Sequence, residues 1–117
     1  MKWSMEPVAQ VAAAAYTLKM DEKRPLARVY LPDGEMLAEL FLVSSAHTLT
    51  GRDVSCECTP WKVREIEGGV ELSAETDSLI WQRKQINLRC YEDRIVYGMT
   101  VEGEGTLTDV ELLSGFY

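Results

Sequence analysis

Short turn-forming sequences punctuate this chain after residue 25 and separate runs in which apolar and polar residues alternate. Pro32-Asp33-Gly34, Gly68-Gly69 and Glu92-Asp93 are three of them. Proline presets φ, aspartate tolerates left-handed geometry and glycine adopts positive φ, so such sequences favour tight reversals of the chain. Alternation with a period of two places one set of side chains on one face of a strand. The pattern predicts antiparallel hairpins.

Seven strands are expected from these runs, with Gly103-Glu104-Gly105 as the last reversal. They are residues 26–31, 35–43, 61–66, 70–75, 84–91, 94–102 and 106–113. Several short strands at this spacing, with no helical period between them, indicate an all-β fold of the antiparallel sandwich or barrel type. The chain has no internal repeat, low-complexity tract or linker. We therefore expect a single domain over residues 1–117, and we favour a β-sandwich.

Residues 8–20 admit two interpretations. Four consecutive alanines favour a helix by propensity. The stretch from Ala14 to Met20 also alternates between a face of small side chains and a face of larger ones, which favours a strand. We prefer the strand, and the helix stays open.

One strand pair predicts which residues form the core. If residues 86–90 pair with residues 95–101, the apolar positions of both strands share one face, and a slip of one residue would expose all of them. The expected inward set is Ile86, Leu88, Ile95, Tyr97 and Met99.

Composition excludes several classes of protein. Apolar residues make up 46% of the 117 and charged residues 26%, which is typical of a folded domain and not of a disordered one. The formal net charge is −7, from 12 basic and 19 acidic residues, so the protein is acidic. That balance argues against nucleic acid and anionic membranes as partners, because both require concentrated positive charge.

The N-terminal region carries no recognisable membrane span or leader. The most apolar early stretch, Val11 to Ala15, is far shorter than the ~20 residues of a membrane span. Glu6, Pro7 and Gln10 interrupt the apolar run that a secretory leader needs. A cytoplasmic location is therefore expected.

The cysteines raise the question of a metal. Cys56, Cys58 and Cys90 are an odd number, too few for a disulfide scaffold, and we expect all three to be reduced. Together with His47 they contain the ligand types of a Cys3His zinc site. A second closely spaced ligand pair is missing, however, and cysteines on strands also serve as small apolar fillers. We predict that no metal or other cofactor is bound.

His47, the single histidine, is the basis for an enzymatic alternative. A small barrel-type enzyme would pair it with a nucleophile such as Ser44 or Ser45 and orient it with Asp53. No strand-turn-helix nucleophile elbow is present. We therefore assign no catalytic residue, and the plainer interpretation is a loop histidine bonded to backbone or water.

Two tryptophans are candidates for sugar binding. An exposed indole can stack on the apolar face of a sugar ring while nearby amides and charges bind its hydroxyls. Trp61 and Trp81 are the candidates, with Gln82 beside the second. In the alternative, both indoles anchor the core, as large aromatic side chains usually do.

The chain closes on Phe116 and Tyr117, with no charged residue after Glu111. Two aromatic side chains at a free end would expose a large apolar area, of a kind that commonly marks an interface. They either fold back onto their own sandwich or pack against a second copy or another subunit, for which a two-fold dimer is the commonest arrangement.

The second half of the sequence resembles a known family. The segments that carry the likeness are 77–84 (DSLIWQRK), 86–97 (INLRCYEDRIVY), 101–105 (VEGEG) and 109–115 (DVELLSG). Over roughly residues 60–115 they are similar to the N-terminal β-sandwich of glycoside hydrolases of the α-glucosidase and α-galactosidase type. In that family the sandwich is a galactose-mutarotase-like or jelly-roll domain that precedes a catalytic (β/α)8 barrel.

The resemblance implies a non-catalytic accessory domain with a structural or interaction role. The barrel, with its nucleophile and acid, lies outside these 117 residues, so no catalytic residue is carried over. In the family the sandwich packs on the barrel and a loop approaches the substrate. By analogy residues 46–53 would be that loop, which makes Arg52 and Asp53 further carbohydrate-binding candidates. The implied partners are a carbohydrate, a catalytic domain or a second copy.

Overall fold

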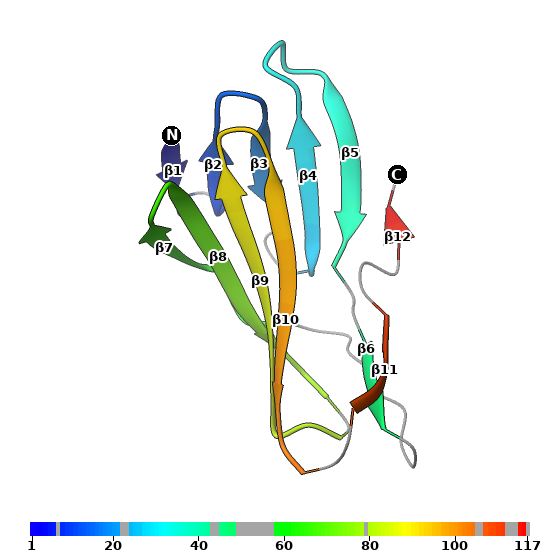
Figure 1. The fold of residues 1–117 in the computed structure, drawn as a ribbon. Coiled ribbons are helices and arrows are strands. Elements are labelled where there is room, and N and C mark those ends of the chain that lie inside the picture. The colour runs from blue at the N-terminus through cyan, green and yellow to red at the C-terminus, as the bar shows by residue number, and fades with distance from the viewer. Residues whose placement is uncertain are drawn as a thin grey trace.

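The runs between the turns form strands along the whole chain (Figure 1). The computed structural model describes residues 1–6, 8–21, 24–42, 45–48, 58–78, 80–104, 107–111 and 115–116. The first six strands are β1 (Lys2–Ser4), β2 (Gln10–Ala12), β3 (Thr17–Met20), β4 (Leu26–Tyr30), β5 (Met36–Phe41) and β6 (Ser45–Thr48). The others are β7 (Lys62–Ile66), β8 (Gly69–Thr76), β9 (Arg83–Tyr91), β10 (Ile95–Glu102), β11 (Leu107–Glu111) and β12 (Gly115–Phe116).

The strands assemble into two large antiparallel sheets and one small one. One large sheet has six strands in the order β1-β2-β3-β4-β5-β12, and the other has four in the order β10-β9-β8-β7. Strands β11 and β6 form a separate pair. The described residues contain no helix, and hence none that could span a membrane. The predicted all-β antiparallel sandwich is confirmed, and over the residues that the structure describes neither large sheet closes into a barrel.

Connections within the large sheets follow a meander. Strands β1 to β5 are successive neighbours in one sheet, and β7 to β10 are successive neighbours in the other. This order differs from the two Greek keys of a jelly roll. In Figure 1 the four-stranded sheet lies in front of the six-stranded sheet, and the β6–β11 pair lies beside the lower part of β10, under β5 and β12.

Glycines supply the left-handed geometry at two of the predicted turns. Gly34 has φ of 92° between β4 and β5, and Gly68 has φ of 77° between β7 and β8. The first turn is closed by two backbone bonds between Leu31 and its neighbours, from Leu31 N to Glu35 O and from Gly34 N to Leu31 O. Asp33 Oδ1 accepts a further bond from the Glu35 amide at 2.9 Å. Glycine at positive φ in both turns, together with the Asp33 side-chain bond in the first, thus explains why the chain reverses at these two places.

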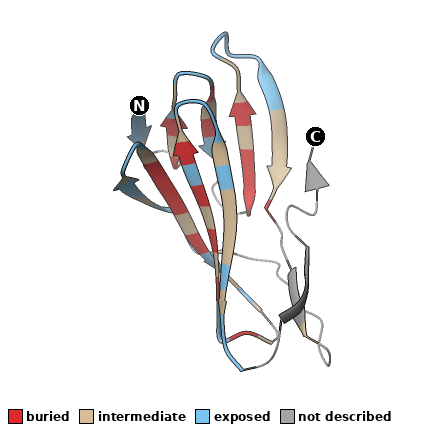
Figure 2. Ribbon diagram, in the orientation of Figure 1, coloured by how far each residue is buried: buried red, intermediate tan, exposed pale blue. Residues whose placement is uncertain are grey.

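The core lies between the two large sheets and follows the predicted register. Ile86 and Leu88 are about 1% exposed. Ile95, Tyr97 and Met99 lie opposite Cys90, Leu88 and Ile86, and all three are half-buried. In Figure 2 buried residues recur along the central strands, separated mainly by intermediate ones, whereas β5 and β10 contain no buried residue. The predicted inward face is therefore confirmed for Ile86 and Leu88 in the core and for Ile95 and Tyr97 packed against it. Met99 is half-buried.

The N-terminal segment is strand on both sides of its alanines. Strand β3 confirms the predicted strand over its last four residues, but Ala14 to Tyr16 belong to the connection that precedes it. The amide of Ala13 donates to Tyr16 O at 2.9 Å, which turns the chain there. The sequence prediction did not include β1 and β2, which pair with each other and extend the sheet to its edge.

One end of the sandwich is closed by contacts between two hairpin loops. The Tyr16 hydroxyl lies 2.7 Å from Tyr91 O and 3.1 Å from Arg94 O, and donates to these carbonyls. Glu92 accepts backbone bonds from the same loop, at its Oε2 from Ala14 N and at its carbonyl from Ala15 N. The β2–β3 loop thus fastens to the β9–β10 turn, and joins the two sheets.

The last predicted strand has a partner that alternation alone does not identify. Strand β11 lies within the predicted range 106–113, and it pairs with β6. Strand β12 pairs with β5, with Phe116 opposite Leu40. The backbone of residues 115–116 therefore pairs with its own sheet, as the fold-back alternative expected.

Candidate functional site

The two tryptophans singled out from the sequence are buried. Trp61 is 5% exposed and Trp81 is 8% exposed, and Trp61 belongs to the core cluster. Neither indole offers an open face for a sugar ring, so the interpretation as exposed stacking platforms is wrong. Their size explains the outcome, because an indole that is left open would expose a large apolar area.

Trp61 nevertheless forms part of the wall of a pocket. The pocket has a volume of about 390 Å³ and lies where β7 begins, against β8 and β9. Its apolar wall consists of Met5, Pro60, Trp61 and Ala74. Its polar lining consists of Thr59, Lys62, Ser73, Glu75, Arg83 and Gln85.

Strand alternation brings the polar groups to this place. Successive side chains of a strand point to opposite faces, and on β8 and β9 the even-numbered residues face the core. The odd-numbered Ser73, Glu75 and Gln85 therefore project from the outer face. Glu75 lies opposite Gln85, and Ser73 lies opposite Lys62 across the β7–β8 pair. The carboxylate, amide, hydroxyl and ammonium groups of these four residues thus lie close together, at two neighbouring outward positions of β8 and opposite them on β7 and β9.

The segment before β7 is anchored to β8 at the pocket rim. The amide of Thr59 donates to Glu75 O at 2.8 Å, and Thr59 Oγ1 accepts from the Glu75 amide at 2.9 Å. Next to Thr59, the backbone of Cys58 pairs with Thr76 in an isolated antiparallel β-bridge. These bonds hold Pro60 and Trp61 in place, so the apolar wall is preformed.

Two charged residues of the pocket, Glu75 and Arg83, pair with each other. Arg83 Nε donates to Glu75 Oε1, and Arg83 Nη1 lies 3.7 Å from Glu102 Oε1. Farther along the same outer face, Glu71 accepts from Arg64 Nη2 at 2.9 Å and Arg89 Nε at 3.1 Å. Glu71, Glu75 and Glu102 thereby each have a cationic neighbour, and these pairs form a row along the outer face.

One polar atom in the wall has no such compensation. Trp61 Nε1 is buried and has no hydrogen-bond partner among the described residues. A buried polar group without a partner is rare in native proteins and raises the free energy of the folded state.

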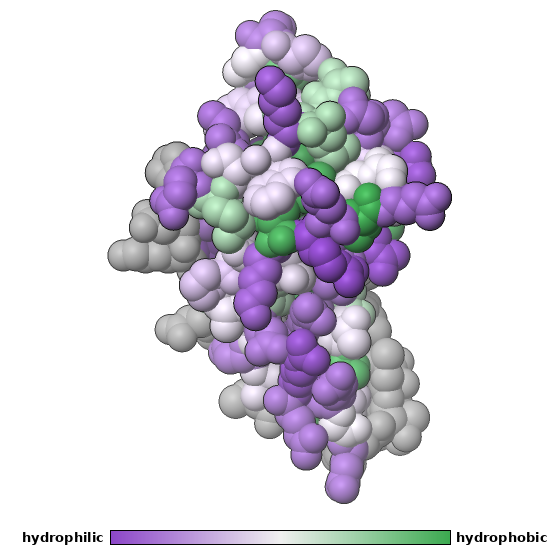
Figure 3. Space-filling model, turned by 90° about the vertical axis from the view of Figure 1, so that its left-hand side faces the viewer, coloured by the Kyte–Doolittle hydropathy of each residue, from purple (hydrophilic) through white to green (hydrophobic). Residues whose placement is uncertain are grey.

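The third tryptophan is the exposed one. Met1, Trp3 and Met5 lie at alternate positions beginning just before β1, and are 43, 41 and 41% exposed. Figure 3 shows the side of the molecule that carries the β1 and β7 edges, where apolar and charged side chains intermingle. Trp3 Nε1 donates to Glu65 Oε1 of β7 at 3.3 Å and so joins the two edges. The sequence interpretation passed over Trp3.

The cysteines that suggested zinc lie far apart. Cys58 lies opposite Thr76 and Cys90 opposite Val70, which separates them by about 20 Å along β8 at 3.3 Å per residue. Two ligands of one zinc ion cannot be so distant. Cys90 is instead a core residue, and burial raises its pKa to about 11, although a bond from Tyr16 opposes the shift. Burial also raises the pKa of Cys58.

The remaining candidates are scattered or lie outside the described residues. Gln82 is exposed, and its amide donates to Glu102 O at 2.9 Å, away from the pocket lining. The backbone of His47 pairs with Asp109 in the β6–β11 sheet. Cys56, Arg52, Asp53 and Tyr117 lie outside the described residues, as do Ser44 and most of the loop 46–53. Among the sugar-binding candidates that the structure describes, only Trp61 lines the pocket.

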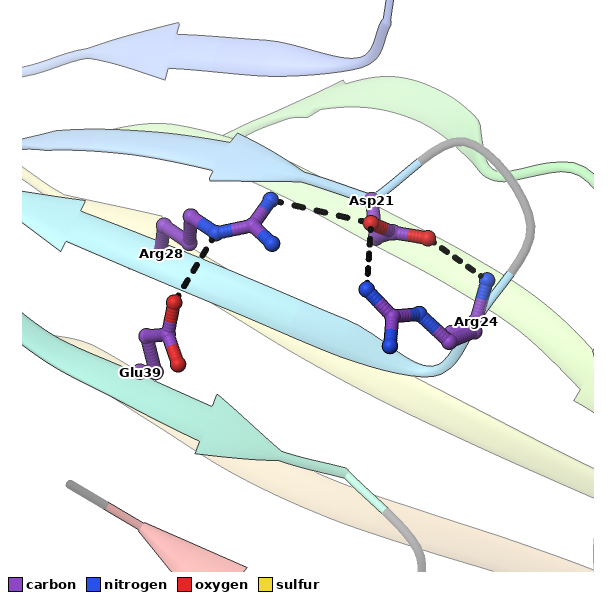
Figure 4. A network of polar contacts seen from close by, with 4 residues as sticks. All are labelled: Asp21, Arg24, Arg28 and Glu39. Atoms are coloured by element: carbon purple, nitrogen blue, oxygen red, sulfur yellow. Dashed lines mark hydrogen bonds and ion pairs between the residues drawn. The ribbon is translucent and has the colours of Figure 1, made fainter.

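A second polar network lies on the outer face of the six-stranded sheet (Figure 4). Arg28 Nε donates to Glu39 Oε1 at 3.1 Å, and Arg28 Nη1 lies 3.6 Å from Asp21 Oδ1. The Arg24 amide donates to Asp21 Oδ2 at 2.9 Å. Because these charges satisfy one another, the network serves to fasten β3, β4 and β5 together.

The pocket residues that sequence reasoning missed share one signal. Lys62, Ser73, Glu75, Arg83 and Gln85 each occupy a polar position of an alternating run. Alternation indicates that they face outward, but their convergence depends on the strand register, which the sequence does not give. Comparison of the chain with family models, curated proteins and solved structures found no match.

Proposed function

We propose that this chain is a non-catalytic β-sandwich domain of the kind that accompanies carbohydrate-active enzymes, and that it binds a neutral carbohydrate in the Trp61 pocket. The resemblance of residues 60–115 to the accessory sandwich of glycoside hydrolases supports the first part. The pocket supports the second.

The residues that line the pocket are the main support for carbohydrate binding. A sugar ring has an apolar face of C–H groups and a periphery of hydroxyls, each of which both donates and accepts. Met5, Pro60 and the edge of Trp61 suit the apolar face. Ser73, Glu75 and Gln85 supply acceptors and donors of the matching kind. Because Glu75 already pairs with Arg83, the pocket favours an uncharged ligand over an ionic one.

The ionisable groups favour binding over catalysis. Catalytic acids and nucleophiles need pKa values moved towards the working pH. Burial moves the pKa values of Cys58, Cys90 and Tyr16 upward, which keeps these groups protonated and unreactive. The carboxylate of the pocket, Glu75, is held in an ion pair of the ordinary surface type.

Calorimetric titration with a panel of α-glucosides and α-galactosides tests the proposal. We expect binding by the native chain, and about tenfold weaker binding by Gln85→Ala, because one to two hydrogen bonds to the sugar are lost. Asn87→Ala is the matched control, since Asn87 projects from the same face two residues along β9 and does not line the pocket.

Two results would contradict the proposal. One is the absence of binding to every saccharide of the panel by a chain that circular dichroism shows to be folded. The other is an equal effect of Gln85→Ala and Asn87→Ala on affinity, which would place the ligand elsewhere. Hydrolysis of any panel member by the purified chain would overturn the non-catalytic assignment.

A further inference from the structure

Among the described residues of the apolar pocket wall, Met5 is the one whose polarity a reversible reaction can change. The wall consists of Met5, Pro60, Trp61 and Ala74. The side chains of proline and alanine resist mild oxidants, and Trp61 is only 5% exposed. Met5 is 41% exposed, and a methionine thioether is oxidised to a sulfoxide that cellular reductases convert back. The apolar character of the pocket therefore depends on the oxidation state of one side chain.

The segment that carries Met5 is held on both sides of this residue. Before it, Trp3 Nε1 donates to Glu65 Oε1 of β7 at 3.3 Å. Around it, Ser4 Oγ donates to Glu6 O at 2.9 Å and accepts from the Glu6 amide at 3.2 Å. None of these bonds involves the Met5 side chain. Oxidation of Met5 would therefore change the polarity of the wall and leave these bonds in place.

The other methionines differ from Met5 in burial or in position. Met20 is 2% exposed and Met99 is half-buried, whereas Met1 and Met36 are 43 and 50% exposed. Met1 precedes β1 and Met36 begins β5, and neither lines the pocket. A peroxide should thus reach Met1, Met5 and Met36 first, and of these three only Met5 changes the pocket.

We propose that Met5 is a redox-sensitive modification site, at which oxidation makes the pocket wall polar and thereby weakens ligand binding. The effect on a ligand rests on the carbohydrate binding proposed above. A sulfoxide oxygen in the wall requires hydrogen-bond donors, which the C–H face of a sugar does not supply. Reduction back to the thioether would restore the affinity, so the site would act as a reversible switch.

The reaction needs a hydroperoxide as its oxidant, with hydrogen peroxide as the simplest. A lone pair of Met5 Sδ attacks one peroxide oxygen, the O–O bond breaks and an S–O bond forms. The departing hydroxide takes the proton of the transferred oxygen and leaves as water. The thioether is thus oxidised and the peroxide reduced, and methionine sulfoxide reductase reverses the change with electrons from a thiol reductant.

Mild oxidation of the ¹⁵N-labelled chain by hydrogen peroxide tests the proposal. Mass spectrometry of proteolytic peptides gives the oxidised fraction of each methionine, and the α-glucosides and α-galactosides are titrated before and after oxidation. We expect about tenfold weaker binding by the oxidised chain. Treatment with methionine sulfoxide reductase should restore the affinity, which separates methionine oxidation from any change at the cysteines.

Two variants assign the effect to one residue. In Met5→Leu, affinity before and after oxidation should be equal, whatever its starting value. Met36→Leu is the matched control, because it removes an equally exposed methionine outside the pocket. It should lose affinity on oxidation as the native chain does.

Several outcomes would overturn the proposal. One is a loss of affinity that persists in Met5→Leu. Another is a Met5 that stays reduced while Met1 and Met36 are oxidised. Undiminished affinity of a chain oxidised at Met5 would also overturn it, and would leave the carbohydrate proposal intact.

The ligand-free chain separates this proposal from the proposed function. If the unoxidised chain binds no saccharide, the proposed function fails, and the indole N–H resonance of Trp61 still reports on the pocket wall. A shift of that resonance on oxidation, absent in Met5→Leu, would support the modification site. No shift in the chain oxidised at Met5 would overturn it.

Discussion

Tyr16 shows how one side chain joins two sheets. Its hydroxyl donates towards Tyr91 O and Arg94 O, across 75 and 78 residues of sequence. The ring itself is 6% exposed. A buried hydroxyl of this kind is important mainly because its removal leaves a carbonyl without its partner.

We expect Tyr16→Phe to lower the free energy of unfolding by about 1–2 kcal/mol, because the bond to Tyr91 O is lost. Urea denaturation measures the change. Tyr30→Phe is the control: Tyr30 is half-buried on β4, and Lys19 Nζ lies 5.1 Å from its ring centroid, a contact that survives the change. Equal losses in the two variants would show that the Tyr16 hydroxyl does not join the sheets.

The buried thiol of Cys90 should make the free energy of unfolding depend on pH in the alkaline range. Burial raises its pKa to about 11 in the folded chain, whereas an unfolded cysteine ionises near about 8.5. The unfolded state therefore loses its proton first as pH rises. The stability contributed by this thiol is complete below about pH 8.5 and is lost as pH rises towards 11. Below that range both states are protonated.

The difference in unfolding free energy between the native chain and Cys90→Ala should accordingly narrow between about pH 8 and pH 10.5. Paired urea titrations at the two pH values measure it. The Tyr16 pKa is also raised, but Tyr16 is present in both chains, so its contribution largely cancels. A difference that stays constant, or widens, would show that the Cys90 thiol ionises at an ordinary pH in the folded protein.

At the scale of elements, the turns determine the hairpins. Gly68 has φ of 77°, which an L side chain rarely adopts, whereas a Cβ added at Gly98 of β10 meets no atom within 4 Å. We expect Gly68→Ala to lower the free energy of unfolding by about 1–2 kcal/mol. Gly98→Ala should have no cost or raise stability slightly, because alanine is the better strand residue. Thermal denaturation compares them, and a costly Gly98→Ala with a harmless Gly68→Ala would contradict the strand assignments.

The hairpins could be predicted from the residues of their turns. The pairing of strands that lie far apart in the sequence could not. The β4–β5, β7–β8 and β9–β10 pairs are joined by turns whose residues require the reversal. The β6–β11 and β5–β12 pairs join segments more than 50 residues apart, and nothing in alternation selects such partners. The short strands β1 and β2 were not predicted, because three residues are too few to show a period of two.

The binding pocket was less predictable than the fold for a related reason. Trp61 was singled out because of its residue type, and it lies in the core, as the core-anchor alternative expected. That part of it also lines a pocket depends on what packs around it. Ser73, Glu75 and Gln85 carry no distinctive motif, and they become a site only when β8 and β9 pair in this register.

At the scale of the whole molecule, the two sheets share one core, and its inner face can be tested by substitution. Leu88 is about 1% exposed, whereas Val96 on the neighbouring strand is 43% exposed. We expect Leu88→Ala to lower the free energy of unfolding by about 2–5 kcal/mol, since a cavity is left in the core. Val96→Ala should change it by less than about 0.5 kcal/mol. Similar losses at both positions would mean that the sheet does not present the assigned face to the core.

The central claim, that a carbohydrate occupies the pocket beside Trp61, is tested most directly by the indole N–H resonances of the three tryptophans in a ¹⁵N-labelled chain. Trp61 lines the pocket, whereas Trp81 is buried elsewhere and Trp3 lies exposed beside Glu65. On titration with the α-glucosides and α-galactosides, the Trp61 resonance should shift saturably while the Trp81 resonance stays in place. A Trp61 resonance that does not move at saturation, or a shift confined to Trp3 or Trp81, would contradict the account.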